Sequence, residues 1–151
     1  MSPQVYRTIA LLLGGASGIG KGYATELAKE GFNIFIIDKN EGDTADAERE
    51  LQKLGAKCGH IIYDFGILGD SQEAENFRSL LDSALAGKDV AILINNVAEF
   101  QHVEFANASA EMIFRQTSSF LSSRVGFSDN AGGCVRMSHF LCLIFKPIFD
   151  H

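Results

Sequence analysis

One short segment near the start of the chain, GGASGIG at residues 14–20, has the composition of a phosphate-binding turn. Glycines at positions 14, 18 and 20 let a backbone turn tightly and approach a ligand closely. This glycine turn stands between an apolar run and a helical pattern, so free amide groups at the helix N-terminus would face an anion. A plain tight turn is the alternative, and the segment taken alone leaves both open.

A second candidate ligand is Asp38, which ends the apolar run 32–38 and follows Gly20 by 18 residues. A carboxylate at this spacing can accept hydrogen bonds from an adenosine ribose, so the two features together predict a dinucleotide site. The carboxylate also repels a 2′-phosphate, which favours NAD over NADP as the cofactor. Lys39 could pair with that phosphate, so NADP stays open as the alternative.

The cysteines and histidines give no comparable pattern. No Cys-x-x-Cys pair occurs, and the odd cysteine count suits a reducing compartment. No histidine stands beside a convincing nucleophile, which argues against a hydrolase. The irregular spacing of four possible zinc ligands matches no familiar finger, so we expect no metal site at Cys134, His139, Cys142 and His151.

Charge and hydropathy exclude further classes. The net charge is −6 and no basic run occurs, which argues against nucleic acid or anionic lipid as partners. No apolar stretch reaches the roughly 20 residues that a membrane-spanning helix needs. We therefore expect a soluble, cytoplasmic protein with a single globular domain over residues 1–151.

The elements that must position these residues alternate between apolar runs and amphipathic helices, as in βαβ units with a buried parallel sheet. Helices are predicted from Gly18 to a stop at Gly31, over 41–54 before Gly55, after Asp70 and before Gly87, and from Ser109. Strands are predicted at 8–13, 32–38, 59–64 and 90–95.

These motifs resemble the short-chain dehydrogenases/reductases, whose fold is a Rossmann-type doubly wound parallel sheet. Residues 13–20 match the family turn Thr-Gly-x-x-x-Gly-x-Gly, with Leu13 in place of threonine. Asp64 matches the aspartate that contacts adenine, with Phe65 following it beside the ring; a carboxylate leading into a helix is the alternative for Asp64. The sequence INNV at 94–97 matches the Asn-Asn-Ala-Gly motif and is closer to the branch with 17β-hydroxysteroid dehydrogenases and 3-oxoacyl-CoA reductases.

The resemblance covers about residues 8–117 and implies a site for a nicotinamide dinucleotide. The residues it assigns to the cofactor are Gly14, Ser17, Gly18, Ile19, Gly20, Asp38, Lys39, Asp64, Phe65, Asn95 and Val97.

The family's catalytic residues, in contrast, do not appear. Its chemistry uses a tyrosine that exchanges a proton with the substrate and a lysine four residues later that lowers the tyrosine's pKa. Tyrosines occur only at 6, 23 and 63, and they are followed at that spacing by Ala10, Leu27 and Ile67. The family asparagine expected after Asn96 is missing from RQTSSFLSS, so we assign no catalytic residue.

The C-terminal segment, 118–151, departs from the family pattern. Four strands in the order 3-2-1-4 would leave the fourth strand with an unpaired apolar edge, which is an aggregation hazard. Apolar residues at 135, 137, 141, 143 and 145 alternate. We expect this segment to replace a fifth strand or to pack over the edge.

Three functions are compatible with this incomplete Rossmann-type fold. The first is an NAD(P)-dependent oxidoreductase for a hydroxyl or carbonyl substrate, present as a truncated form that is inactive alone and meets its alcohol or ketone only when intact. The second is a non-catalytic module that binds nicotinamide nucleotides. The third is an interaction protein that pairs with a full-length relative in a homo- or hetero-oligomer.

Overall fold

The computed structural model describes residues 8–67, 71–98, 107, 109–112, 134–135 and 142–145. Its elements in chain order are β1 Ile9–Leu13, α1 Gly18–Lys29, β2 Asn33–Asp38, α2 Glu41–Lys53, β3 Cys58–Ile62, the 3₁₀ turn η1 Phe65–Ile67, α3 Ser71–Leu85, β4 Val90–Asn95, β5 Cys134–Val135 and β6 Cys142–Phe145.

The described residues fall into two compact units. Those within 1–63, 87–96 and 129–151 form unit 1, which contains the whole sheet with α1 and α2. Those within 64–86 and 97–128 form unit 2, which contains η1, α3 and a short helical stretch at 110–112.

The sheet of unit 1 has the strand order β3-β2-β1-β4-β6-β5. The first four strands are parallel, so the predicted 3-2-1-4 order of a Rossmann-type sheet is confirmed. Strand β6 then runs antiparallel along β4, with Leu143 opposite Ile94, and the two-residue β5 pairs with β6. The backbone of residues 142–145 therefore covers the β4 edge, as the alternating pattern predicts.

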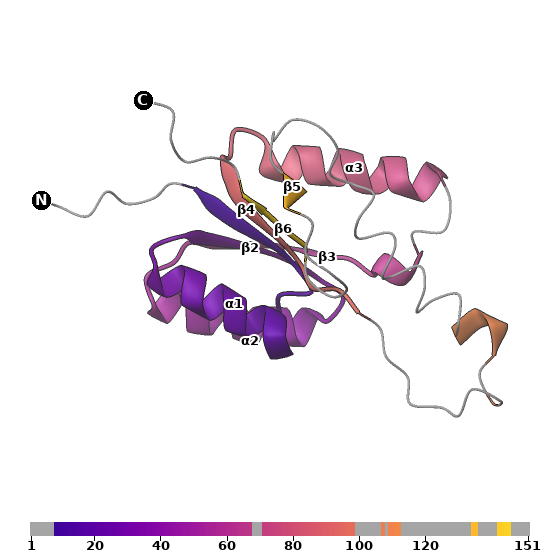
Figure 1. Cartoon of the computed structure of the whole chain (residues 1–151), viewed down its shortest axis with the longest axis horizontal. Helices are drawn as coiled ribbons and strands as arrows, with labels where there is room; N and C mark the ends of the chain where they lie inside the picture. The colour runs from indigo at the N-terminus through magenta and orange to yellow at the C-terminus, as the bar shows by residue number, and fades with distance from the viewer. Residues whose placement is uncertain are drawn as a thin grey trace, which may run out of the picture. The chain divides into compact units, whose positions relative to one another are not determined.

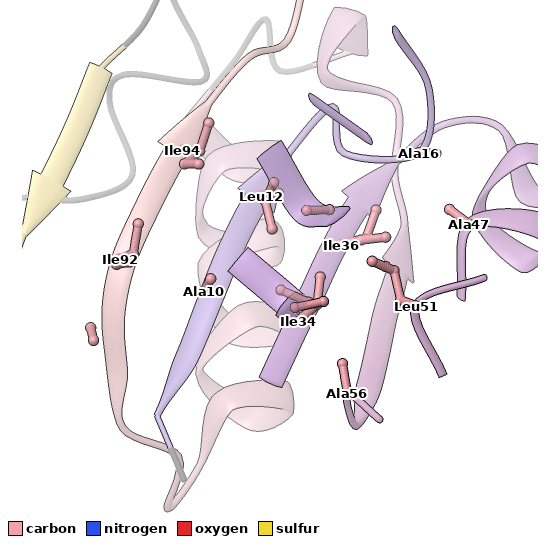
Figure 2. Close-up of a cluster of buried hydrophobic side chains, with 13 residues drawn as sticks. Ala10, Leu12, Ala16, Ile34, Ile36, Ala47, Leu51, Ala56, Ile92 and Ile94 are labelled. Atoms are coloured by element: carbon pink, nitrogen blue, oxygen red, sulfur yellow. The ribbon is translucent and has the colours of Figure 1, made fainter. Parts of the chain in front are cut away.

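Helices α1 and α2 lie side by side on one face of this sheet (Figure 1). The apolar cluster between them and the strands is shown in Figure 2. Its fully buried members include Leu12 in β1, Ile36 in β2 and Ala24 in α1. Burying each Leu or Ile contributes about 1.5–3 kcal/mol, which holds the helices against the strands.

The other face of the central strands is buried as well: Leu11, Leu13 and Ile37 are inaccessible to solvent. A strand with both faces buried reads as an unbroken apolar run, which explains why residues 9–13 are IALLL rather than alternating. The predicted strand 90–95 coincides with β4.

Two predictions, the bounds of the third strand and the buried face of the first helix, differ from the structure. The third strand covers Cys58–Ile62 rather than 59–64, because the chain leaves the sheet after the Tyr63 amide donates to the Asp38 carbonyl (2.9 Å). In α1, Ile19 is 73% exposed. Its spacing of four and five residues from the next apolar side chains in the sequence predicts one apolar stripe, formed by Ile19, Tyr23, Ala24, Leu27 and Ala28. Ile19 lies five positions, or about 140°, from the buried Ala24, so it faces away from the sheet.

The helix ends are set by local chemistry that the sequence shows clearly. Gly31, Gly55 and Gly87 follow α1, α2 and α3 with φ of 93°, 91° and 69°, the left-handed conformation predicted for a C-terminal glycine. Ser109 accepts a hydrogen bond from the Met112 amide (3.1 Å), which confirms the predicted helix start there.

Candidate dinucleotide site

The glycine turn joins β1 to α1 at the carboxyl edge of the parallel strands. Gly14 and Gly18 have φ of 74° and 53°, which residues with a Cβ adopt only at a cost. Ser17 caps α1 with extended backbone angles and makes no side-chain cap hydrogen bond. The first hydrogen bond within the helix runs from the Lys21 amide to the Ser17 carbonyl (3.1 Å).

The amides of Gly18, Ile19 and Gly20 precede that bond and have no acceptor within the helix. Residues 17–19 are exposed to solvent. Donors of this kind at the positive end of a helix form a suitable site for a phosphate group.

Gly20 brings α1 into close contact with the start of the turn. A Cβ at this position would lie 2.0 Å from the Gly14 carbonyl oxygen and 2.8 Å from Asn96 Nδ2. Asn96 itself donates from Nδ2 to that same carbonyl (3.1 Å), and its backbone amide donates to the Leu13 carbonyl (2.9 Å). The end of β4 thus fixes the conformation of the glycine turn, and only glycine fits at position 20.

Asp38 lies beside the turn because β1 and β2 end in register, with Leu13 opposite Ile37. Its Oδ2 accepts a hydrogen bond from the Ala16 amide, and its Oδ1 accepts one from the Asn40 amide, both at 3.1 Å. The side chain is half-buried. The structure therefore brings the predicted ribose ligand and the predicted phosphate turn together.

The remaining site residues lie in different places. Asn95 is buried at the end of β4, where its backbone pairs with Leu13, and Lys39 is exposed directly after Asp38. Asp64, Phe65 and Val97 belong to unit 2, and their part in the site stays a prediction.

In unit 2, Asp64 fits the alternative stated for it as well. Its Oδ1 accepts the Gly66 amide (2.9 Å) and its carbonyl accepts the Ile67 amide (3.2 Å), so it holds η1. Phe65 is buried, with its ring edge-to-face against Phe77 at 5.4 Å between centroids.

Comparison with protein-family models gives a match to the short chain dehydrogenase family over residues 8–135. The chain belongs to the short-chain dehydrogenase family. The match covers the glycine turn, Asp38 and the paired asparagines, which confirms the family predicted from those motifs.

Curated relatives point to one branch of the short-chain dehydrogenases. The chain is 35% identical over 88 residues to the very-long-chain 3-oxoacyl-CoA reductase of Pyricularia oryzae, covering 58% of this chain and 26% of that protein. It is 31% identical over 98 residues to the protein of the same name from Macaca fascicularis, covering 64% and 29%. The branch predicted from the Asn-Asn-Val sequence is therefore supported, and the chain spans between a quarter and a third of the length of these relatives.

Solved structures confirm the fold. A short chain dehydrogenase from Burkholderia cenocepacia in complex with NADP superposes with a TM-score of 0.65 at 22% identity, covering 82% of this chain and 49% of that one. One from Mycobacterium paratuberculosis bound to NAD gives 0.65 at 16% identity, covering 80% and 47%. The dinucleotide class predicted from the sequence is the class that these two proteins bind.

Sequence reasoning missed three contributors to this short-chain dehydrogenase site. The Ala16 amide, the Asn96 side chain and Gly15 were not assigned, although all three shape the turn. A Cβ on Gly15 would lie 2.8 Å from Leu12 Cβ, so the Gly-Gly doublet was the available signal for it. No sequence signal marks the Ala16 amide, because a backbone donor is independent of side-chain type.

The described residues contain neither a tyrosine followed four residues later by a lysine nor a group of possible metal ligands. Tyr23 and Tyr63 are followed four residues later by Leu27 and Ile67. Among the residues whose side chains are described, no group of three possible metal ligands occurs. The four possible zinc ligands at 134, 139, 142 and 151 lie outside that part, as do the serines at 118–123. No helix within the described ranges is long and apolar enough to cross a membrane.

Proposed function

We propose that this chain binds NAD(P) through the glycine turn and Asp38, as the nucleotide-binding part of an oxidoreductase that acts on a hydroxyl or carbonyl substrate. The observation that carries the proposal is the Ala16–Asp38 hydrogen bond of 3.1 Å, which sets a carboxylate beside the free amides of a helix N-terminus. Bound NAD(P) supplies hydride chemistry, with hydride passing to or from its nicotinamide ring.

The chain's own residues have separate parts in this proposal. The amides of Gly18 to Gly20 bind the pyrophosphate, and Asp38 accepts hydrogen bonds from the adenosine ribose. As the family resemblance implies, Asp64 and Phe65 contact the adenine, and Asn95 and Val97 belong to the turn that lines the cofactor cleft. The Asp38 carboxylate disfavours a 2′-phosphate, so NADH binds more tightly than NADPH, with Lys39 reducing the difference.

The glycine turn leaves room for a pyrophosphate group. A Cβ on Gly18 would meet no atom within 4 Å, so the space outside the turn is open. A side chain at position 18 would therefore project into the volume that a pyrophosphate needs, and the left-handed backbone there would be strained as well.

The first experiment titrates the 151-residue chain with NADH and NADPH and follows nicotinamide fluorescence. We expect saturable binding of both, with tighter binding of NADH, and at least a tenfold loss of affinity in Gly18→Val. Gly22→Ala is the matched control, because a Cβ there also meets only open space but lies further along α1. Equal binding by the two variants, or no binding by the unaltered chain, would contradict the proposal.

Turnover is a separate question, because no Tyr-x-x-x-Lys occurs in the 151 residues. We expect no reduction of a long-chain 3-oxoacyl-CoA, the substrate class in the names of the curated relatives, by this chain alone. Oxidation of NADH dependent on such a substrate would show that other residues supply the proton.

A role as an interaction protein receives less support. That function would use an exposed sheet edge or the apolar C-terminal tail, and β6 already pairs along the β4 edge. The compartment stays a prediction.

A further inference from the structure

We infer that Asp38 positions the glycine turn in addition to contacting ribose. The charge of residue 38 and its hydrogen bond to the turn then affect dinucleotide binding separately. This inference rests on the proposed function. It differs from a role in ribose recognition alone, because it makes a hydrogen-bond acceptor at residue 38 necessary for tight binding of the phosphate part of any ligand.

The first step is the geometry of the two Asp38 hydrogen bonds. The bond from the Ala16 amide to Oδ2 is partly buried and joins residues 22 apart in the chain. The bond from the Asn40 amide to Oδ1 is exposed and local. Water can replace the acceptor for the Asn40 amide, but the Ala16 amide is less accessible and depends more on the carboxylate.

The second step is where Ala16 stands. Its methyl group is buried in the cluster between the sheet and α1, with 2% of the residue exposed. Its amide is held by Asp38, and the next residue, Ser17, caps the helix without a side-chain hydrogen bond of its own. The Ala16–Asp38 contact therefore fixes the chain directly before the three amides that face a phosphate.

The third step is the sign of the expected effects. Removing a carboxylate near a bound anion strengthens anion binding, because like charges repel. Removing the acceptor for Ala16 loosens the turn and weakens anion binding. The two roles of Asp38 therefore predict opposite changes for a ligand that has phosphates but no ribose.

Two substitutions separate the roles. Asp38→Ala removes both the charge and the acceptor. Asp38→Asn removes the charge but keeps one oxygen, which is expected to face the less accessible Ala16 amide and leave the Asn40 amide to water. Asp46→Ala is the matched control, since it also removes one carboxylate from unit 1 but lies on α2.

The ligand measurement is a calorimetric titration with inorganic pyrophosphate at low ionic strength. We expect Asp38→Ala to bind it about tenfold more weakly than the unaltered chain, the effect of losing one charge-assisted hydrogen bond. Asp38→Asn is expected to bind it at least as tightly as the unaltered chain, and Asp46→Ala to show no loss. Asp38→Asn is also expected to bind NADPH more tightly than Asp38→Ala does.

The second measurement needs no ligand. Amide hydrogen exchange of the ¹⁵N-labelled chain reports the Ala16 amide directly, and we expect faster exchange at Ala16 in Asp38→Ala than in Asp38→Asn or Asp46→Ala. Unchanged exchange at Ala16, together with pyrophosphate affinity in Asp38→Ala equal to or above that of the unaltered chain, would overturn the inference. If the unaltered chain binds neither pyrophosphate nor NADH, the proposed function fails, and the exchange at Ala16 alone decides whether Asp38 holds the turn.

Discussion

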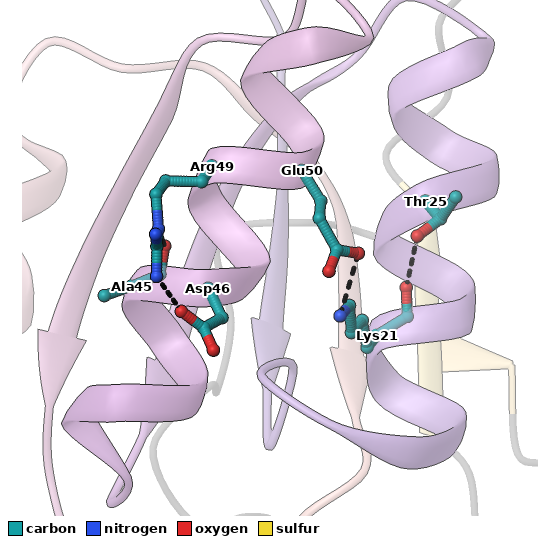
Figure 3. A network of polar contacts seen from close by, with 6 residues as sticks. All are labelled: Lys21, Thr25, Ala45, Asp46, Arg49 and Glu50. Atoms are coloured by element: carbon teal, nitrogen blue, oxygen red, sulfur yellow. Dashed lines mark hydrogen bonds and ion pairs between the residues drawn. The ribbon is translucent and has the colours of Figure 1, made fainter.

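Two regions of unit 1 are held together in different ways. At the glycine turn, Asp38 and Asn96 hydrogen-bond to backbone groups of residues 14–16, and a Cβ at Gly20 has no room. Along the outer side, formed by α2 and β3, ion pairs lie near the surface. Figure 3 shows two of these, Lys21–Glu50 between α1 and α2 and Arg49–Asp46 within α2.

This difference indicates which positions of the chain tolerate substitution. The proposed ligand depends on the backbone positions of the turn, which a binding site must hold to within about 0.5 Å. Exposed ion pairs on the outer side contribute little and tolerate replacement. Substitutions at the glycine turn should therefore affect both stability and binding, whereas those on the outer side should affect neither strongly.

The largest effect is expected for Gly20→Val. The new side chain would overlap the Gly14 carbonyl, where even a Cβ would stand at 2.0 Å, so we expect a loss of about 3 kcal/mol or more in the free energy of unfolding. Urea denaturation measures it. Gly22→Ala in the same helix is the control and should stabilise by about 1 kcal/mol, because alanine is the better helix former. Similar stabilities for the two variants would mean that the close contact at Gly20 does not restrict the residue at that position.

A smaller loss is expected for Asn96→Ala. The Gly14 carbonyl would lose its donor from β4, which costs about 1–2 kcal/mol for a partly buried acceptor and also loosens the turn. Denaturation and NADH titration should both report the change. Asn76→Ala, which removes an exposed hydrogen bond with Gln72 in α3, should change neither. An Asn96 variant with normal stability and affinity would show that the Asn96 side chain does not position the turn.

The β3 edge of the outer side offers a pH test at Cys58. Burial, with a smaller contribution from the Glu48 charge, raises the pKa of this thiol from 9.0 to about 11. Iodoacetamide labelling of Cys58, followed by peptide mass spectrometry, should therefore be slow at pH 8 and still be rising at pH 10. Labelling that levels off near pH 9 would contradict this environment.

The raised pKa of Cys58 also makes the stability of the folded chain fall as the pH rises. Between the two pKa values the folded chain keeps the Cys58 proton that the unfolded chain loses. The contribution of the protonated thiol to the free energy of unfolding is therefore fully present below pH 9. It is lost as the pH rises toward about 11. Replacing Cys58 with Ser should reduce the fall in stability over that pH window.

The smallest effect is expected for the Lys21–Glu50 pair, whose 2.8 Å contact joins side chains that are 29% and 56% exposed. A double-mutant cycle with Lys21→Ala and Glu50→Ala should give a coupling energy of about 0.5 kcal/mol or less, because solvent screens the pair. A coupling above about 2 kcal/mol would mean that the outer side is as tightly specified as the turn.

Much of this arrangement could be predicted from the sequence, for identifiable reasons. Three of the four parallel strands, β1, β2 and β4, are built on continuous apolar runs, and glycines at 31, 55 and 87 mark the helix ends. The spacing of Asp38 after the glycine turn follows from the βαβ unit that carries both. Side-chain patterns of this kind are local, so they can be read along the chain.

What could not be predicted depends on contacts between distant segments. The Ala16 amide and the Asn96 side chain find partners 22 and 82 residues away, and neither residue type identifies its partner. The antiparallel direction of β6 was likewise open, because an alternating apolar pattern is the same in both directions. The exposure of Ile19 could not be predicted from spacing alone, because Ile19 lies four residues before Tyr23 but about 140° around the helix from the buried Ala24.

The most direct test of the central claim is a titration of the ¹⁵N-labelled chain with NAD⁺, followed by amide chemical shifts. If the glycine turn and Asp38 form the dinucleotide site, the amides of Gly18, Ile19 and Gly20 should shift saturably, together with those of residues 38–40. The amides of α2 should stay in place. No shifts at millimolar NAD⁺, or saturable shifts confined to α2 or β3, would contradict the account.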